Sequence, residues 1–414
     1  MTVVADTLQE EASRVLPEIR NSFAGILANL PSPIRRPRDI TRVMGVNQTL
    51  AWKIMQVVKV KDPFAAAQYI PGSEGVNIFL DAARRLDAPE KVITRTRAAM
   101  DGFRQLIADH AGDRASLELM LGASATEGSP QTDLTYRKGG FQCASYTWGI
   151  QARARLMTIM LYPHSDPNLI RCAKIAGFVG LRRVRPQICW PLAQPMYGDY
   201  EEGSNVPREQ PFLPIDSDGA LPGGVPLLRP FSTVSPDAVQ RIALPNGQLE
   251  DCWVGSPVGD RAAINCFTGE IVRKPSPRYA DEENLYVEVG TRIRTPMEVL
   301  VRDLFVHRDL YGRIEPESTV YSELSVQPWF DTPQAERRDQ DVLPFSETVE
   351  YLGAGPTVIH TPDVPLYEDM MRFAFTKLGW DIHACDVYRV RVAYPVIATA
   401  LTVRFPLPPA PSSE

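Results

Sequence analysis

Apolar positions recur at helical spacing near the start of the chain. They lie three or four residues apart, at Leu8, Ala12, Val15, Ile19, Phe23, Ile26 and Leu30. This spacing places them on one face of a helix, in which Pro17 predicts a kink or a restart. We expect the stripe to face a protein core or a dimer seam. Similar spacing predicts helices over residues 63–69, 73–86 and 90–109, so residues 1–121 are expected to form an all-helical domain.

The pattern changes to alternation after Tyr146. Apolar side chains stand at every second position, at Trp148, Ile150, Ala152, Ala154 and Leu156, and polar ones between them, at Gln151, Arg153 and Arg155. Alternation of this kind is typical of a strand. Further strands are predicted over residues 178–185, 249–254, 261–266, 285–293, 299–306, 386–394 and 397–405, with an amphipathic helix over 367–378. We therefore expect an α+β fold, in which a mostly antiparallel, strand-rich domain over residues 141–405 follows the helical one.

Composition supports two unlike halves. The chain has 414 residues, a length typical of two or three domains. Of its 37 prolines, 29 lie in residues 131–414, which excludes a helix bundle there because each interior proline removes a helical hydrogen bond. Residues 122–140 are rich in Gly, Ser and Thr and are predicted to form a linker, and residues 406–414 a flexible tail.

No membrane or secretion signal is found in the sequence. No apolar run approaches the roughly 18 residues that a membrane span needs. The first residues include Asp6, Glu10 and Glu11 where a signal peptide has basic and then apolar residues. We therefore expect a cytoplasmic protein without a membrane partner.

Charge is distributed unevenly along the chain. The net charge of −6 argues against indiscriminate binding of nucleic acid by the whole surface. Between Pro31 and Lys61, however, seven lysines and arginines accompany a single acid, Asp39. A basic run of this kind often forms a solvated surface, so its meaning depends on the residues that it contains.

The basic run has a pattern typical of two short helices joined by a tight turn. Asp39 can cap a first helix, and Gly45 suits the left-handed backbone that ends it. Asn47 can then cap a second helix that runs to about Val58. Apolar or small residues stand where two crossed helices pack, at Ile40, Val46, Ala51 and Ile54.

These residues, with Gly45, resemble the helix-turn-helix of bacterial transcription regulators, in its λ-repressor-like and IclR-like versions. Thr41 departs from the alanine common at its position. The resemblance covers residues 38–58 only, and no strand pair follows that could form a wing. The same spacing also fits a purely structural helical hairpin.

The resemblance implies that the second helix enters the major groove of double-stranded DNA, N-terminal end first. Its outward residues would be Asn47, Gln48, Thr49, Trp52, Lys53 and Gln56. Asn and Gln can pair with adenine edges, and Lys can reach guanine or phosphate. Phosphate contacts are expected from Arg35, Arg36, Arg38 and Arg42. Trp52 is expected to pack against Phe64, with stacking on the sugar–phosphate edge as the alternative.

Motifs for catalysis are incomplete, and no catalytic residue or cofactor is expected. The sequence His-Arg-Asp-Leu at 307–310 resembles the catalytic loop of protein kinases, but Ile314 stands where a kinase has its metal-binding Asn. The sequence Gly-Ser-Pro-Val-Gly at 255–259 resembles a nucleophile elbow. Pro257 removes a backbone N–H that an oxyanion hole would use, so a hairpin turn is expected instead.

Cysteine and histidine positions predict no metal site. All six cysteines lie in the second half without a Cys-x-x-Cys pair and are expected to be buried thiols. Cys252 and Cys266 could face each other across a hairpin. His383 and Cys385 would share one strand face, but no further ligands accompany them.

A short basic segment at residues 180–185 is a second candidate for charge recognition. Arg183 and Arg185 are expected on one face of a strand and Arg182 on the other. Such a pair could hold an anion, or it could form ion pairs with the acids at 201–202.

Three hypotheses for function follow. The first is a DNA-binding transcriptional regulator, in which the second half senses an effector or self-associates, since two-fold dimers are the usual form of helix-turn-helix proteins. The second is a structural protein whose helical domain binds another protein. The third is an enzyme of unrecognised type, with its site in the strand-rich domain. Salt-dependent DNA binding that Lys53→Glu abolishes would distinguish the first.

Overall fold

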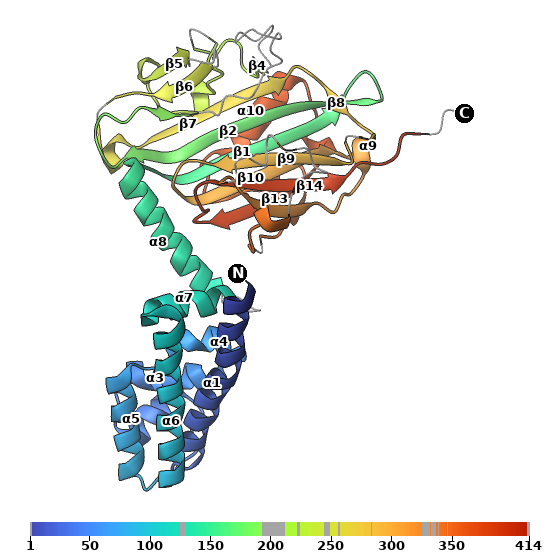
Figure 1. The fold of residues 1–414 in the computed structure, drawn as a ribbon. Coiled ribbons are helices and arrows are strands. Elements are labelled where there is room, and N and C mark those ends of the chain that lie inside the picture. The colour runs from blue at the N-terminus through green and yellow to red at the C-terminus, as the bar shows by residue number, and fades with distance from the viewer. Residues whose placement is uncertain are drawn as a thin grey trace. The chain divides into compact units, whose positions relative to one another are not determined.

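The chain forms two compact units, Met1–Asp133 and Leu134–Glu414. The computed structural model describes residues 2–124, 130–192, 212–221, 224–243, 249–255, 257–282, 284–324, 332, 337, 339–345 and 347–411. Helices make up the described part of the first unit, and strands dominate the second (Figure 1). The predicted α+β fold, helical first and mostly antiparallel afterwards, is therefore confirmed.

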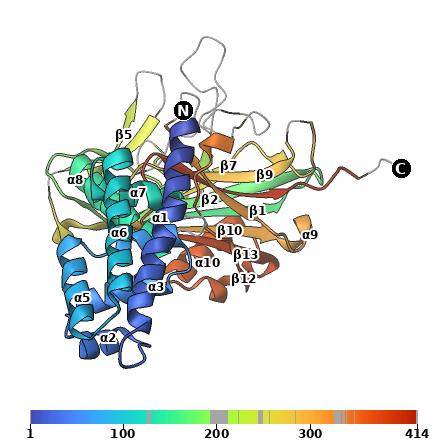
Figure 2. The ribbon, with the colours of Figure 1, turned by 60° about the horizontal axis from the view of Figure 1, so that its bottom comes forward.

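The first unit is built from short helices around α1 (Figure 2). In chain order these are α1 (Thr2–Ala28), α2 (Pro37–Met44), α3 (Gln48–Lys59), α4 (Pro63–Ala66), α5 (Ser73–Arg85), α6 (Glu90–Leu106) and α7 (Arg114–Ser124). A 3-10 turn at Ala67–Tyr69 follows α4, and a π-helical turn at Ile107–Ala111 follows α6. The helices predicted near residues 63–69, 73–86 and 90–109 are thus present.

The apolar stripe of α1 forms the centre of the helical core. Ala12, Ile19, Phe23 and Ile26 are fully buried, and the ring of Phe23 lies 5.4 Å from that of Phe79 on α5. The helix is continuous through Pro17, so the alternative of a restarted helix is wrong. Because the stripe is buried within its own unit, the proposal that it forms a dimer seam is also wrong.

Much of the predicted linker is helical. Helix α7 extends to Ser124, and α8 (Pro130–Trp148) covers the second half of the segment 122–140. Helix α8 also includes the first residues of the predicted strand, Tyr146 and Trp148. Strand β1 (Ile150–Pro163) begins after Gly149, whose φ is 71°. Glycine tolerates this left-handed backbone at the end of a helix.

The described residues of the second unit form one large sheet and two small ones. The order of the large sheet is β12 (Glu350–Ala354), β13 (Cys385–Ala393), β10 (Met297–His307), β1, β2 (Leu169–Arg183), β7 (Ile264–Val272) and β4 (Phe212–Pro214), with β8 (Ser276–Pro277) paired to β2. A second sheet has the order β11 (Glu317–Ser322), β14 (Thr399–Pro406) and β9 (Tyr286–Ile293), and a third the order β3 (Trp190–Pro191), β6 (Leu249–Trp253) and β5 (Val239–Ala243). Among the described strands, β1 and β10 pair in parallel and the other ladders are antiparallel.

Each face of the large sheet is covered by a different layer. On one face Leu300 and Leu304 of β10 share a core with Leu401 and Val403 of β14. On the other face the core includes Val301, Phe305 and residues of helix α10 (Tyr367–Leu378), which was predicted with these bounds. Figure 1 shows α10 behind the sheet and β9 and β14 in front of it. The second unit is thus a three-layer structure.

Two details of β1 differ from the alternating pattern. Ile150 and Ala152 belong to one core, whereas Ala154 and Leu156 belong to the other. The ladder with β2 is interrupted at this point, opposite Gly180, whose φ is 60° and whose N–H donates to the Asn265 side chain at 2.9 Å. Arg155, predicted on a polar face, is buried, because both faces of the strand are covered.

The end of the chain also differs from expectation. The predicted strands over 386–394 and 397–405 are present as β13 and β14, but they lie in different sheets. After β14, Leu407 is buried and its N–H donates to the Leu285 carbonyl at 2.9 Å. The prediction of a flexible tail from residue 406 is therefore wrong for Leu407, while residues 412–414 lie outside the described part.

A buried polar network joins the sheet to the layer of α10. Both carboxylate oxygens of Asp303 accept hydrogen bonds from Arg389, at 2.8 and 2.7 Å, and one accepts from the hydroxyl of Tyr367 at 2.9 Å. Asp303 is fully buried. Burial and the nearby Asp303 raise the pKa of Tyr367 well above its usual value, so this hydroxyl remains a donor.

Asp303→Ala is expected to destabilise the second unit strongly. The substitution leaves the Arg389 guanidinium buried without its carboxylate, which typically costs about 3–5 kcal/mol of unfolding free energy. Urea denaturation of the full chain measures this loss. As a control, Glu368→Ala removes an exposed pair with Arg372 on α10 and should cost at most about 0.5 kcal/mol. Equal losses in the two variants would contradict the assigned role of Asp303.

Candidate nucleic-acid interface

Helices α2 and α3 are joined by a turn of three residues. Gly45 ends α2 with φ of 70° and ψ of 21°, and its N–H donates to the Thr41 carbonyl at 3.0 Å. The Asn47 side chain accepts a hydrogen bond from the Leu50 N–H at 2.8 Å, so Asn47 caps α3. Both predicted signals, the left-handed glycine and the asparagine cap, are confirmed.

Asp39 fixes the start of α2 in a way that differs from the prediction. The N-cap residue is Arg36, and Asp39 lies in the first turn of α2. The Asp39 carboxylate accepts hydrogen bonds from the N–H of Arg35 at 3.0 Å and from the N–H of Arg36 at 2.9 Å. These two hydrogen bonds hold the pKa of Asp39 below its usual value. The carboxylate therefore organises the backbone that presents the neighbouring arginines.

The inner side of the helix pair is closely packed. The four residues assigned to the crossing, Ile40, Val46, Ala51 and Ile54, are all buried, as predicted. The Lys59 ammonium donates to the Arg35 carbonyl at 3.1 Å, which ties the basic segment before α2 to the end of α3. The pair is thus a fixed element of the helical core.

The outer side presents most of the predicted DNA-binding residues to solvent. The exposed ones are Arg35, Arg36, Arg38, Arg42, Asn47, Gln48 and Thr49. Lys53 and Gln56 are half-buried. Arg42 lies 3.7 Å from the carboxylate of Asp39, a separation at which an exposed pair contributes little.

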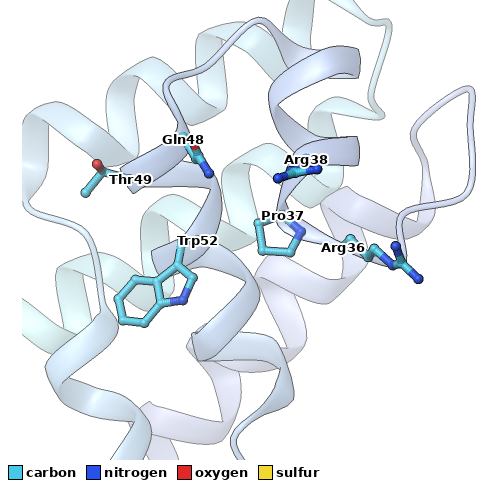
Figure 3. A pocket seen from close by; sticks show the side chains of 6 residues that line it. All are labelled: Arg36, Pro37, Arg38, Gln48, Thr49 and Trp52. Atoms are coloured by element: carbon cyan, nitrogen blue, oxygen red, sulfur yellow. The ribbon is translucent and has the colours of Figure 1, made fainter.

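Part of this set surrounds one surface hollow of about 500 Å³. Its lining consists of Arg36, Pro37, Arg38, Gln48, Thr49 and Trp52. In Figure 3 the side chain of Gln48 lies between those of Thr49 and Arg38, and Trp52 lies below Gln48 in this view. Arg35, Arg42, Asn47, Lys53 and Gln56 lie outside this lining. The hollow thus combines guanidinium groups with the first turn of α3.

Two lining residues have roles that the sequence reasoning missed. Trp52 packs edge-on against Tyr69, with ring centroids 5.3 Å apart, and remains 42% exposed. Its packing against Phe64 stays a prediction. Pro37 is the first residue of α2, one position before the segment 38–58 over which the sequence predicts the pair of helices. Proline is favoured at this position because the first helical N–H has no partner within the helix, so this signal could have been found.

The other candidate sites are not assembled by the structure. Cys385 begins β13 and is buried, whereas His383 lies in the preceding 3-10 turn and is exposed. Within the described residues, no group of three or more potential ligands could hold a metal ion. Cys252 and Cys266 are free thiols. In the segment His307–Leu310, the His307 Nδ1 atom accepts the Asp309 N–H at 3.2 Å and caps a short helix, α9 (Arg308–Tyr311).

The basic segment at 180–185 is engaged within the second unit. Arg183 is buried, donates to the carbonyls of Ile188 and Trp253 at 2.8 and 3.0 Å, and stacks on the Trp253 ring. Arg182 lies 3.1 Å from the carboxylate of Asp260. The acids at 201–202, like Ser256 of the candidate elbow, lie outside the described residues.

No protein-family model matches the chain, and no curated protein matches it.

In the described part of the chain, no helix is long and apolar enough to cross a membrane.

Gly45→Ala tests whether the turn depends on left-handed backbone. A Cβ at this position meets no atom within 4 Å, so the expected loss of about 1 kcal/mol comes from the positive φ alone. The matched control is Gly122→Ala in helix α7, where a Cβ also meets open space and alanine is favoured by about 0.5–1 kcal/mol. Thermal unfolding measures both, and destabilisation by Gly122→Ala as well would contradict the assignment.

Proposed function

We propose that this protein is a DNA-binding transcriptional regulator whose first unit contacts double-stranded DNA through α2 and α3. The observation that supports the proposal most is the hollow in which Arg36 and Arg38 meet Gln48 and Thr49 of the first turn of α3. Recognition helices of helix-turn-helix proteins read bases with their N-terminal residues. Here those residues are exposed and adjoin guanidinium groups.

The arginines and the helix residues would have different tasks. Guanidinium groups bind phosphate oxygens in bidentate fashion and set the register of a protein on the duplex. Arg36, Arg38 and Arg42 would make these contacts, with Arg35 and Lys53 adding to the positive field. Gln48 and Asn47 can form paired hydrogen bonds with adenine, although Asn47 would keep its side-chain oxygen on the Leu50 N–H. Gln48 is therefore the stronger candidate for reading sequence.

The proposal includes a homodimer and a cytoplasmic location. A single recognition helix buries little surface, and two-fold dimers are the usual way to reach useful affinity. With the stripe of α1 used inside its own unit, the strand-rich second unit is the remaining candidate for self-association. Sensing of an effector is the alternative role for the second unit.

Binding to mixed-sequence DNA should weaken steeply with salt. Fluorescence anisotropy of the full chain over a salt series measures the slope of log affinity against log salt concentration, which reports the number of phosphates contacted. Lys53→Glu should weaken binding at least tenfold, because it places a like charge beside phosphate. Arg104→Glu on α6 makes the same charge change outside the helix pair and serves as the control. Absent or salt-independent binding in the unaltered protein would overturn the proposal.

Gln48→Ala separates sequence reading from phosphate binding. A preferred site is first selected from random duplexes with the unaltered protein. Loss of one bidentate base contact should reduce discrimination by about 1–3 kcal/mol for that site, with little change in the affinity for mixed DNA. The opposite result, an equal loss for both kinds of DNA, would assign Gln48 to backbone contacts.

A further inference from the structure

Two buried arginines lie on the face of the large sheet that is covered by the sheet of β9 and β14. Arg155 of β1 is 3% exposed and Arg302 of β10 is 1% exposed. In the parallel register Arg155 lies opposite Leu300, and Arg302 lies opposite Met157. The two arginines are therefore two positions apart on neighbouring strands and point to the same face.

Both guanidinium groups extend to the same part of β9. The Arg155 Nη1 atom donates to the Arg292 carbonyl at 2.8 Å, and the Arg302 Nη1 atom donates to the Thr291 hydroxyl. Thr291 and Arg292 are consecutive residues of β9. The register of β1 and β10 and these two hydrogen bonds thus bring the two cations together between the layers.

The hydrogen-bonding capacity of the two guanidinium groups is used only in part. Arg155 Nε, Arg302 Nε and Arg302 Nη2 are buried and have no hydrogen-bond partner among the residues that the structure describes. Burial lowers the pKa of Arg155 to about 10 and, together with the charge of Arg155, that of Arg302 to about 9. Both groups are still protonated at neutral pH, so two positive charges stand in the protein interior.

Nearby groups do not neutralise these charges. Asp303, the next residue after Arg302, already accepts two hydrogen bonds from Arg389. Burial raises the pKa of the Cys172 thiol to about 11, so this neighbour of Arg302 is neutral. Among the described residues, neither Arg155 nor Arg302 is within ion-pair distance of a carboxylate. Buried charges in proteins are normally paired, and an anion from solution would provide the missing partner.

We propose that the second unit binds a small monovalent inorganic anion, of the size of chloride, between the guanidinium groups of Arg155 and Arg302. The free N–H groups supply charged donors, which bind anions more strongly than neutral ones do. The ion must be small and give up its water, because it would lie between two packed layers. This excludes nucleotides and favours a halide over phosphate.

Chloride should therefore stabilise the fold. Thermal unfolding of the full chain is followed while chloride replaces gluconate at constant ionic strength, gluconate being too large to be enclosed. A chloride concentration ten times the dissociation constant should raise Tm by about 3–6 °C. A Tm that does not depend on chloride overturns the proposal.

Arg302→Met should abolish the chloride-dependent shift. The control is Arg183→Met, which removes an equally buried arginine whose donors have carbonyl partners and should leave the shift unchanged. An equal shift in the Arg302→Met protein would overturn the proposal. If that variant does not fold, bromide-soaked crystals of the unaltered protein decide. An anomalous bromide peak within hydrogen-bond distance of both guanidinium groups supports the site, and ordered water without such a peak overturns it.

Discussion

The long strands at the centre of the second unit are buried on both faces. This constraint determines which layers cover the large sheet and how the chain connects them. Strands β1, β2 and β10 form the middle of the large sheet, and their apolar residues belong to two separate cores. A sheet of this kind needs a layer on each side to exclude water. Helix α10 supplies one layer, and the sheet of β9, β14 and β11 supplies the other. The chain therefore has to leave the large sheet after β13 and complete a different sheet with β14.

Charged residues on strands that are buried on both faces need partners for their charge and their hydrogen-bond donors. The buried arginines of the second unit find different partners. Arg389 has the carboxylate of Asp303. Arg183 has two backbone carbonyls and an aromatic ring. Arg155 and Arg302 have one hydrogen bond each to the described residues, and for this reason we propose an external anion as their partner. Buried arginines thus have three different partners in this unit: a carboxylate, backbone carbonyls and, as proposed, a bound anion.

In the helical unit, the boundaries of α2 and α3 are set by hydrogen bonds between residues close in sequence. Gly45, Asn47 and Asp39 define the ends of α2 and α3 through hydrogen bonds to residues no more than four positions away. The buried side of the pair is anchored by Ile40 and Ala51, which leaves the basic and amide side chains on the outside. The proposed contact with DNA would use this polar outer face, in which basic side chains can reach phosphate and amide side chains can reach bases.

The sequence alone determined most helices of the first unit, most of the strands, the end of α2 and the start of α3, because these depend on periodicity and on contacts within a few residues. It missed helix α8, which it gave as a linker and the start of a strand. It also located most of the residues around the hollow. Only the tertiary structure decided that Arg155 is buried, that β13 and β14 part into different sheets, and that Trp52 packs on Tyr69. Alternation along one strand shows which residues share a face but not whether the other face is covered. Whether a face is covered depends on segments more than a hundred residues away, such as β9 and β14 over β1, and no local pattern encodes that contact.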